Sequence, residues 1–599
     1  MAEESWVFER TPKMGGATGE AFTNTLLGAG MEPAAVLARE AIQNSSDAQA
    51  GDEKVRVEFR RVTLTGAAKA NFVAAMNLKP ALTGRQKQLK LPRDTCLETI
   101  DDPRHPLTLL YIEDYGTFGL HGKPDKARSH FFRLLLSLGD GAKAREAEGS
   151  GGSYGFGKSV YSSNSRIHSI VAYSVFDPSL SGVDGRNHAR AMGCGYFNAH
   201  EFKGEDYTGR AWFGKSVHKG TAAEPLIDQA AHEFAKRLGF TPRTKGQRGT
   251  SLLIVDCGVD CEMLRASIED WWWPRLLNEE LGLDVKLFED GNPLQPPRPR
   301  KRADLRPFID CYDLAVKRSM PIGAHQKAGS LHKLENTSLG DFGYAVVAEE
   351  AAADEGLREL LGTIALIRKP HMVIQYMPIG GTLPLPCVGA FVASSDVDDY
   401  LKRSEPATHD QWDPKSARLD ELPELARAVV TAINQRLRTG LRRFANEAAP
   451  QDPKQDLRLK ALEKLLGGVF KSPTSDTTST GGTASDPITI SFVDRPHIVA
   501  SDAQIATAGS FRVALADDAD RDKVKVAVKV NCLVQEDEGV SKEDSIDVML
   551  QSTEVKGKFK NTAALTFELD RDSRPLFMFK SAAYPSDWTT RVEVHVEEV

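Results

Sequence analysis

Cysteine is scarce in this chain, and its few cysteines are scattered. Seven occur among 599 residues, and Cys257 and Cys261, the closest pair, lack further ligands at the spacing of a zinc site. We therefore expect reduced core thiols, as in a cytoplasmic protein, and neither a zinc site nor a disulfide framework. The chain also lacks an apolar run long enough to cross a bilayer, and its first residues do not form a signal peptide. These absences predict a cytoplasmic protein without a membrane partner.

The chain has no strong excess of charge of either sign. It carries 76 Lys and Arg against 83 Asp and Glu, and this formal net charge of −7 gives no overall attraction to nucleic acid. Hydrophobic residues make up 41% and charged residues 27% of the sequence, which is typical of globular domains. The length suits about three or four domains.

Glu40, Asn44 and Asp47 would lie on one stripe of a helix formed by the segment AAVLAREAIQNSSDAQ. Apolar neighbours such as Leu37 and Ile42 predict that the helix is buried, and buried polar groups need partners. A hydrated magnesium ion would satisfy the stripe, because it prefers oxygen ligands and keeps several of its waters. The alternative is a solvated helix face.

A short apolar run, Leu109–Ile112, leads to Asp114 and Gly116. This pattern predicts a strand that delivers a carboxylate into a glycine-permitted turn. The carboxylate could accept a hydrogen bond from an exocyclic amine such as that of adenine, and the glycine would let a flat ring approach the backbone. An ordinary turn at the end of a strand is the alternative.

A glycine-rich segment covers residues 149–159 and includes Phe156 and Lys158. Its backbone N–H groups could surround a polyphosphate, and the lysine would add positive potential. The alternative is a flexible linker, which would not need these two side chains.

The same segment also fits the phosphate loop of a different nucleotide-binding fold. Gly152 to Ser159 matches G-x-x-x-x-G-K-[ST], and Leu252–Asp256 could supply the strand with a metal-binding aspartate that such enzymes carry. That loop must directly follow a buried parallel strand, but residues 139–148 are polar. The context therefore favours a different nucleotide site.

Taken together and in this order, these segments resemble the GHKL family of ATPases, named after gyrase, the heat-shock chaperone, histidine kinases and MutL. The family's first motif, E-x-x-x-N-[SA]-x-D-A, is similar to the run from Glu40 to Ala48, and its second, D-x-G-x-G, to the run that starts at Asp114. In the second motif Phe118 takes the place of the expected glycine, and Gly119 follows it. The glycine-rich segment is similar to the family's lid, and Gly249-Thr250 to a Gly-Thr pair that starts a strand. The resemblance covers roughly residues 10–260.

The resemblance implies a role for each matching residue. Glu40 would be the general base that deprotonates the attacking water, a role that favours hydrolysis over the phosphotransfer of histidine kinases. Asn44 would bind the Mg²⁺ that bridges the phosphates of ATP. Asp114 would read the adenine amine with the support of Thr250. The remaining nucleotide contacts would come from Asp47, Gly116 and Gly119, and from the lid residues Gly152, Gly155, Phe156, Gly157 and Lys158.

The resemblance also implies an α+β architecture. We expect an N-terminal Bergerat-fold α/β sandwich (a mixed sheet covered by helices) at 1–262 and a second, transducer-like α/β domain at 263–450. From the second domain Lys369, or Arg368 beside it, would reach the terminal phosphate. Strand-like runs occur at 55–59, 191–197 and 209–217 in the first domain and at 284–288, 343–348 and 371–376 in the second.

The last third of the chain changes in composition. A Ser-, Thr- and Gly-rich stretch predicts a helix end and a flexible linker over 451–485. Alternating runs such as Val524–Val530 predict an all-β sandwich over 486–599. This sandwich has no catalytic constellation, so we expect it to bind a protein partner.

The sequence thus predicts an ATPase whose Mg-ATP cycle closes a lid, drives formation of a homodimer and regulates a partner. ATPases of this kind that carry large modules without motifs resemble parts of bacterial DNA-handling and anti-phage defence systems, so DNA is a further expected partner. Two alternatives stay open at this stage. One is a protein-remodelling, chaperone-like ATPase, and the other is a scaffold that binds ATP without turnover.

Overall fold

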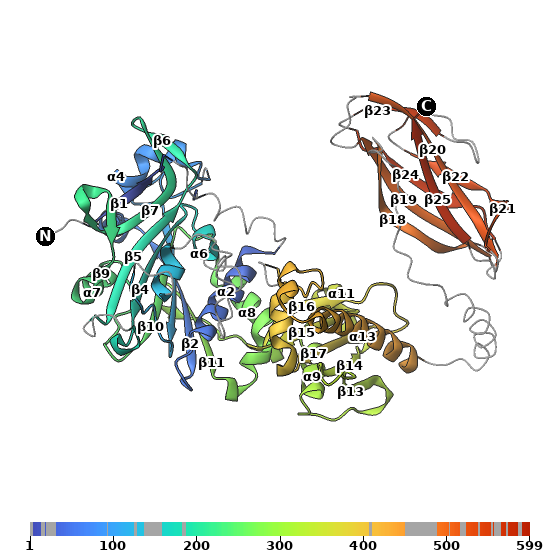
Figure 1. Cartoon of the computed structure of the whole chain (residues 1–599), viewed down its shortest axis with the longest axis horizontal. Coiled ribbons are helices and arrows are strands. Elements are labelled where there is room, and N and C mark those ends of the chain that lie inside the picture. The colour runs from blue at the N-terminus through green and yellow to red at the C-terminus, as the bar shows by residue number, and fades with distance from the viewer. Residues whose placement is uncertain are drawn as a thin grey trace. The chain divides into compact units, whose positions relative to one another are not determined.

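The computed structural model describes most of the chain, which divides into two compact units at residue 450 (Figure 1). The units are Met1–Pro450 and Gln451–Val599, and each is described by itself. The described residues are 4–13, 18–19, 31–92, 94–124, 129–136, 159–181, 187–406, 410–449, 488–501, 504–515, 523–536, 539–552, 555, 565–570, 573–584 and 590–598.

The first unit contains a mixed sheet of twelve described strands. Its main path runs in the order β1-β7-β5-β4-β10-β3-β2-β11-β12, with β6 and β8 paired to β7 and β9 paired to β5. The pairs along this path are antiparallel except for β2 with β11, which is parallel. The strands are β1 Glu4–Arg10, β2 Val55–Leu64, β3 Leu107–Tyr115, β4 Ser169–Val175, β5 Ala189–Tyr196, β6 His200–Phe202, β7 Glu205–Val217, β8 Ala222–Glu224, β9 Leu226–Ile227, β10 Gly249–Val255, β11 Leu283–Glu289 and β12 Asn292–Pro293.

Helices cover both faces of this sheet, as alternating side chains of a central strand require. On β3, Leu110 and Ile112 pack with α2 (Pro33–Asp47) and α8 (Cys261–Leu276), whereas Leu109 and Tyr111 face α7 (Asp228–Arg237). Further short helices are α3 Gly66–Ala75, α4 Leu78–Leu82, α5 Gln86–Leu89 and α6 Ser159–Ser163.

The predicted strands at 55–59, 191–197 and 209–217 are present as β2, β5 and β7. The predicted strand at 284–288 is also present, but it lies in the first sheet and not in the second. Strand β11 pairs in parallel with β2, from Leu283 opposite Val55 to Glu289 opposite Arg61. Helix α8 lies between β10 and β11 in the chain and supplies the crossover connection that a parallel strand requires. The first sheet therefore extends past residue 262 to β12.

A second sheet of five described strands follows in the same unit, in the order β13-β14-β17-β15-β16. Helix α9 (Arg306–Ala315) packs on one face, and α13 (Glu424–Ala448) packs on the other with buried residues from Val429 to Phe444 at helical spacing. The predicted strands at 343–348 and 371–376 appear as β14 and β16. The other elements are β13 Gln326–Ser330, β14 Gly340–Val346, β15 Thr363–Arg368, β16 Met372–Pro378, β17 Cys387–Ala393, α10 Glu349–Ala352, α11 Glu355–Leu360 and α12 Asp398–Ser404.

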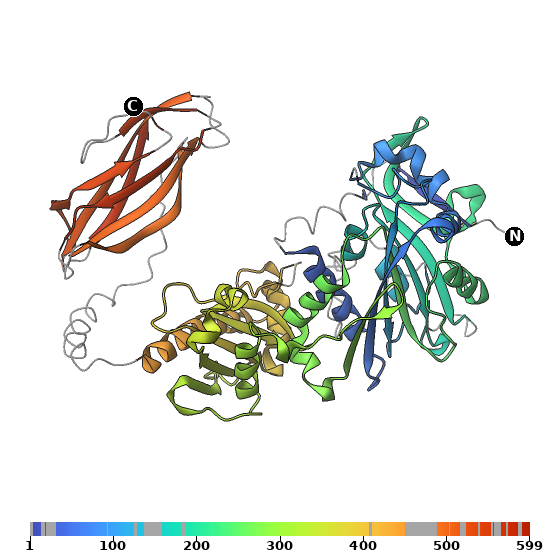
Figure 2. The ribbon, with the colours of Figure 1, turned by 180° about the vertical axis from the view of Figure 1, so that it is seen from behind.

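Helices α2 and α8 lie side by side between the two sheets, as Figures 1 and 2 show from opposite sides. Helix α8 also contacts β16, the edge strand of the second sheet. One hydrophobic cluster accordingly includes Leu37 of α2, Trp272 of α8 and Ile374 of β16.

The second unit consists of two described four-stranded sheets. Phe511 and Phe577 of one sheet share a core with Val526 and Val528 of the other, which makes the unit a β-sandwich. The strands are β18 Ile488–Ser501, β19 Gln504–Leu515, β20 Lys523–Glu536, β21 Gly539–Ile546, β22 Val548–Gln551, β23 Leu565–Asp570, β24 Leu576–Ser581 and β25 Thr590–Glu598.

The chain therefore combines a mixed α/β part with separate all-β sheets, which agrees with the α+β class expected from the sequence. Among the described helices, none has the length and apolar character that crossing a bilayer requires.

Candidate functional site

Helix α2 carries the first motif at the centre of the first unit. It begins at Pro33, whose missing N–H suits the first turn of a helix, and apolar side chains such as Leu37 and Ile42 bury its length. Glu40 is only 7% exposed, Asn44 is partly buried and Asp47 is exposed at the C-terminal end. The helix therefore carries the predicted polar stripe from a buried centre to an open end.

Asn44 is oriented by a tyrosine that the sequence analysis missed. Its Nδ2 donates a hydrogen bond to the hydroxyl of Tyr161, 3.1 Å away in α6, and its amide oxygen remains as the acceptor of the group. Burial raises the pKa of Tyr161, and the carboxylates of Glu40 and Asp114 raise it further. The hydroxyl is therefore neutral at pH 7 and lies near both carboxylates. Its position directly after the glycine-rich run was the one available sequence signal.

The turn after β3 is fixed to the end of α2 by backbone hydrogen bonds. The N–H of Phe118 donates to the carbonyl of Ala48 over 2.8 Å, and the N–H of Ala50 donates to the carbonyl of Gly116 over 3.0 Å. The first and second motifs, 70 residues apart in the chain, therefore form one local structure.

Two glycines of this turn have conformations and surroundings that exclude other residues. Gly116 has φ +75° and Gly119 has φ +69°. A Cβ at Gly116 would lie 2.5 Å from the carbonyl oxygen of Lys54, and one at Gly119 would lie 2.6 Å from that of Val175. The second position that requires glycine is thus Gly119, one residue after Phe118.

The carboxylate of Asp114 joins three segments. Its Oδ1 accepts hydrogen bonds from the Thr250 N–H at 2.8 Å and from the Thr117 hydroxyl at 2.6 Å. Its Oδ2 faces the Ser45 hydroxyl at 3.4 Å, but that hydroxyl also donates to the carbonyl of Ala41 at 3.0 Å. Because a hydroxyl has a single proton, Oδ2 has the weaker support and is the oxygen best able to accept an N–H of a ligand.

Arg243, which no sequence pattern indicated, holds the strands on which this site is built. Its Nη2 donates to the carbonyls of Asp114 and, at 3.0 Å, of Thr250. Its guanidinium carbon lies over the ring of Tyr115, 4.2 Å from the ring centroid. Burial raises the pKa of Asp114, and this guanidinium opposes the shift. Gly249 permits the approach, since a Cβ there would lie 2.3 Å from the Asp114 carbonyl oxygen.

The predicted lid falls outside the described residues. This applies to Gly152, Gly155, Phe156, Gly157 and Lys158. The description resumes at Ser159, the first residue of α6, two residues before Tyr161.

The strand directions in the first sheet exclude the alternative phosphate-loop fold. Strand β10, which would have to be its parallel metal-binding strand, is antiparallel to both neighbours, β3 and β4. Asp256 at its end accepts a 2.6 Å hydrogen bond from the Cys96 N–H and forms an ion pair with Arg166 at 3.2 Å. This aspartate therefore has a structural role at the opposite end of β10 from Thr250.

The second sheet brings cations to the end of α2. Lys369 is exposed in the turn between β15 and β16. The guanidinium of Arg275 links that turn to the segment just after α2, because it donates to the carbonyl of Pro370 and to Gln49 Oε1, each at 3.4 Å. Arg368, the alternative to Lys369, is committed elsewhere. Its Nη2 donates to Glu405 Oε2 at 2.6 Å, and both side chains are buried.

A further cation, Lys402 of α12, lies within electrostatic range of Asp47. Burial lowers the pKa of Lys402, and the carboxylate of Asp47 opposes this shift. The C-terminal end of the polar stripe therefore lies near the positive charge of α12.

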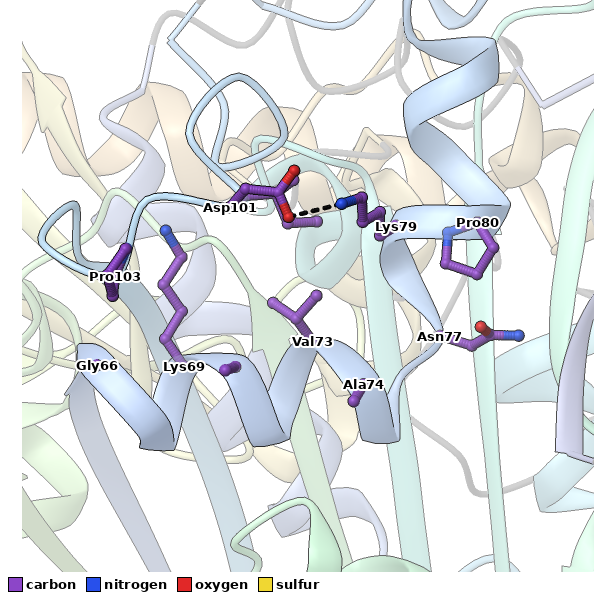
Figure 3. A pocket seen from close by; sticks show the side chains of 11 residues that line it. Gly66, Lys69, Val73, Ala74, Asn77, Lys79, Pro80, Asp101 and Pro103 are labelled. Carbon is purple, nitrogen blue, oxygen red and sulfur yellow. Dashed lines mark hydrogen bonds and ion pairs between the residues drawn. The ribbon is translucent and has the colours of Figure 1, made fainter.

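A pocket of about 260 Å³ lies away from these motifs, between α3 and the segment that includes Asp101 and Pro103 (Figure 3). An ion pair between Lys79 and Asp101, at 2.8 Å, spans its rim. Lys69 in its wall is fully engaged, since its Nζ donates to the carbonyls of Thr99, Asp102 and His105 at 2.6–2.9 Å. None of these groups contacts the residues of the first two motifs.

No cluster of three or more His, Cys, Asp and Glu side chains suited to a metal occurs among the described residues. A magnesium ion held by one amide oxygen and by phosphates needs no such cluster, and the side-chain amide oxygen of Asn44 is a suitable ligand.

Comparison with models of known protein families found no match, and a search of curated proteins also found none.

Proposed function

We propose that the first unit of this chain binds Mg-ATP and hydrolyses it. The observation that carries the proposal is the position of Asp114. Its carboxylate contacts Thr250 at 2.8 Å and Ser45 at 3.4 Å, so the three described motifs meet at one partly buried acidic group. A partly buried carboxylate with one poorly supported oxygen is suited to accept the exocyclic amine of adenine.

The polar stripe of α2 supplies the groups that the chemistry needs. Asn44, turned by its bond to Tyr161, would offer its amide oxygen to the magnesium ion. Such an ion, when bound, would neutralise charge on the phosphates. Glu40 would orient a water molecule and accept its proton as the water oxygen attacks the terminal phosphorus and ADP leaves. Lys369, or Lys402, would add positive charge at the far end of the stripe.

The resemblance to the GHKL family supports the same assignment. In that family the mixed sheet is a Bergerat fold, and the second α/β domain acts as a transducer. A glycine-rich lid, here residues outside the described part, closes over the triphosphate. In chaperone-like and MutL-like members the closed lid forms a twofold dimer. We extend this cycle to the present chain as a proposal, with the β-sandwich as the site for a protein partner.

The proposed setting is the handling of DNA by a bacterial cell, including defence against phage. It rests on analogy with ATPases that carry large modules without motifs. Two rival functions give different results in one experiment. The rate of phosphate release would be measured for the full chain with Mg²⁺, alone and with duplex DNA, single-stranded DNA or unfolded protein. Stimulation by DNA supports the proposal, stimulation by unfolded protein alone favours a chaperone, and ATP binding without release favours a scaffold.

A further inference from the structure

An arginine next to the proposed base fastens α2 to the second sheet. Arg39 is 1% exposed, and its Nη1 donates to the carbonyl oxygens of Val373 and Ile374, each at 3.2 Å. Both acceptors belong to β16, the edge strand of the second sheet. The second sheet thus contacts α2 at the residue before Glu40.

The two carbonyls lie at a β-bulge. Leu366 of β15 pairs with Gln375, but the next residue, Ile367, pairs with Val373, so Ile374 is an extra residue of β16. A bulge of this kind interrupts the alternation of carbonyl directions along a strand. It therefore lets two consecutive carbonyls of an edge strand meet one guanidinium group.

Three consecutive tryptophans of α8 close the same contact. The ring of Trp271 lies 4.4 Å from the Arg39 guanidinium carbon, and the Nε1 of Trp272 donates to the Ala38 carbonyl at 3.2 Å. The Nε1 of Trp273 instead donates to the hydroxyl of Tyr376 in β16 at 3.0 Å. Helix α8 thereby contacts α2 on one side and β16 on the other. The aromatic run Trp271–Trp273 therefore forms part of the seam between the two sheets.

Burying a guanidinium costs desolvation free energy that an apolar side chain in the same place would not cost. Desolvation lowers the pKa of Arg39 to about 10, against the attraction of Glu40, Glu405 and Asp410. The group therefore stays charged at neutral pH, and a methionine of similar length would avoid the cost of desolvation. What a methionine cannot do is bond to two carbonyls and so fix the rotation of α2 about its axis.

We propose that Arg39 is a positioning residue for ATP hydrolysis, which holds Glu40 in register by fastening α2 to the bulge of β16. This inference rests on the proposed function. Glu40 follows Arg39 on a rigid helix. A shift of β16 relative to α2 therefore moves the carboxylate of Glu40 relative to the attacking water. A displacement of about 1 Å at such a group lowers a rate roughly 100-fold. The second sheet would thus control turnover through a contact that touches neither nucleotide nor water.

The test separates positioning from loss of fold. The turnover number and the dissociation constant for ATP would be measured in the full chain for Arg39→Met and Arg39→Lys. Lys69→Met is the matched control, because Lys69 is also a buried cation that donates to backbone carbonyls, in the wall of the separate pocket (Figure 3). Trp271→Leu removes the stacked ring without removing the charge, and this tryptophan is only partly buried.

We expect Arg39→Met to lower the turnover number at least about tenfold with a dissociation constant within about twofold of wild type. Arg39→Lys should recover part of the rate, Trp271→Leu should lose part of it, and Lys69→Met should lower the melting temperature without lowering turnover per folded molecule. If Arg39→Met does not fold, the lysine and leucine variants carry the test.

Other results would overturn the inference. A wild-type rate in Arg39→Met, or a loss of ATP affinity that accounts for the whole loss of activity, would exclude a positioning role. An equal fall in Lys69→Met would reduce the effect to general stability. If the wild-type chain itself released no phosphate, the proposed function would fail first and this inference with it. Activity in the wild type with an unaffected arginine variant overturns the inference alone.

Discussion

Asp114 and Thr250 are 136 residues apart in the chain, and the carboxylate of the first accepts a 2.8 Å hydrogen bond from the backbone N–H of the second. Among the described residues, the other carboxylate oxygen faces only the shared proton of Ser45. The arrangement explains why one acidic group can be held by protein and still accept a bond from a ligand.

Asp114→Asn should weaken ATP binding without unfolding the first unit. Loss of a hydrogen bond to a charged acceptor costs about 1.5–3 kcal/mol, which raises the dissociation constant roughly 10- to 150-fold. Calorimetric titration of ATP into the variant would measure it. GTP, which has no exocyclic amine at the corresponding position, is the control ligand, and its binding should change less. An unchanged dissociation constant for ATP would mean that the adenine ring binds elsewhere.

Gly119→Ala should distort the turn that joins the two motifs. The alanine would have to adopt φ +69° and place its Cβ 2.6 Å from the Val175 carbonyl oxygen. Gly51→Ala is the control, since Gly51 has a similar φ of +59° with nothing within 4 Å. Strain from φ alone costs about 1–2 kcal/mol, so only the first variant should also lose ATP affinity. Equal losses of affinity in the two variants would contradict this account of the turn.

The site was predictable from the sequence where its groups follow a local rule. Glu40, Asn44 and Asp47 are related by helical periodicity, and Asp114 with Gly116 by the geometry of a strand that ends in a turn. Arg243 and Tyr161 follow no such rule, because Arg243 acts through carbonyls of two strands, one of them 129 residues away, and Tyr161 through a contact between two helices. Such contacts exist only once the sheet has formed.

The same distinction applies to the fold. Alternating side chains correctly predicted a strand at 284–288, but periodicity does not say which strand is its neighbour. The parallel pairing of β11 with β2 joins residues more than 200 positions apart and depends on the crossover through α8. The tryptophan run of α8 lies at the seam between the two sheets. Its individual partners, Arg39, Ala38 and Tyr376, could not be read from composition.

Lys369 and Arg368 should behave differently although they are adjacent. Lys369→Ala removes an exposed side chain, so it should leave the melting temperature unchanged and lower ATP turnover at least about tenfold if this lysine reaches the terminal phosphate. Arg368→Ala should instead destabilise the first unit by about 3–5 kcal/mol, because it removes the ion pair that neutralises the buried Glu405. Circular dichroism and phosphate release would measure the two effects. Wild-type turnover in Lys369→Ala would transfer the role to Lys402.

Acid should destabilise the first unit through His130. Burial is the main cause that lowers the pKa of His130 to about 4, and the adjacent His121 ring, 4.4 Å away, lowers it further. Between about pH 6.5 and 4 the unfolded chain then binds a proton that the folded chain does not, so stability falls as the pH falls through this range, by up to about 1.4 kcal/mol per pH unit. His130→Gln removes this titratable group. The midpoint of urea unfolding should therefore fall less in the variant than in the wild type between pH 7 and 5. Parallel falls would contradict the assignment.

The central claim is that Glu40 is the base of an ATP hydrolase, and the Glu40→Ala variant tests it most directly. Phosphate release and ATP binding would be measured on the same preparation with Mg²⁺. The account predicts that release is abolished while ATP still binds with wild-type affinity, because the carboxylate contacts water and not the nucleotide. Turnover at the wild-type rate in Glu40→Ala, or a wild-type chain that neither binds nor hydrolyses ATP, would contradict it.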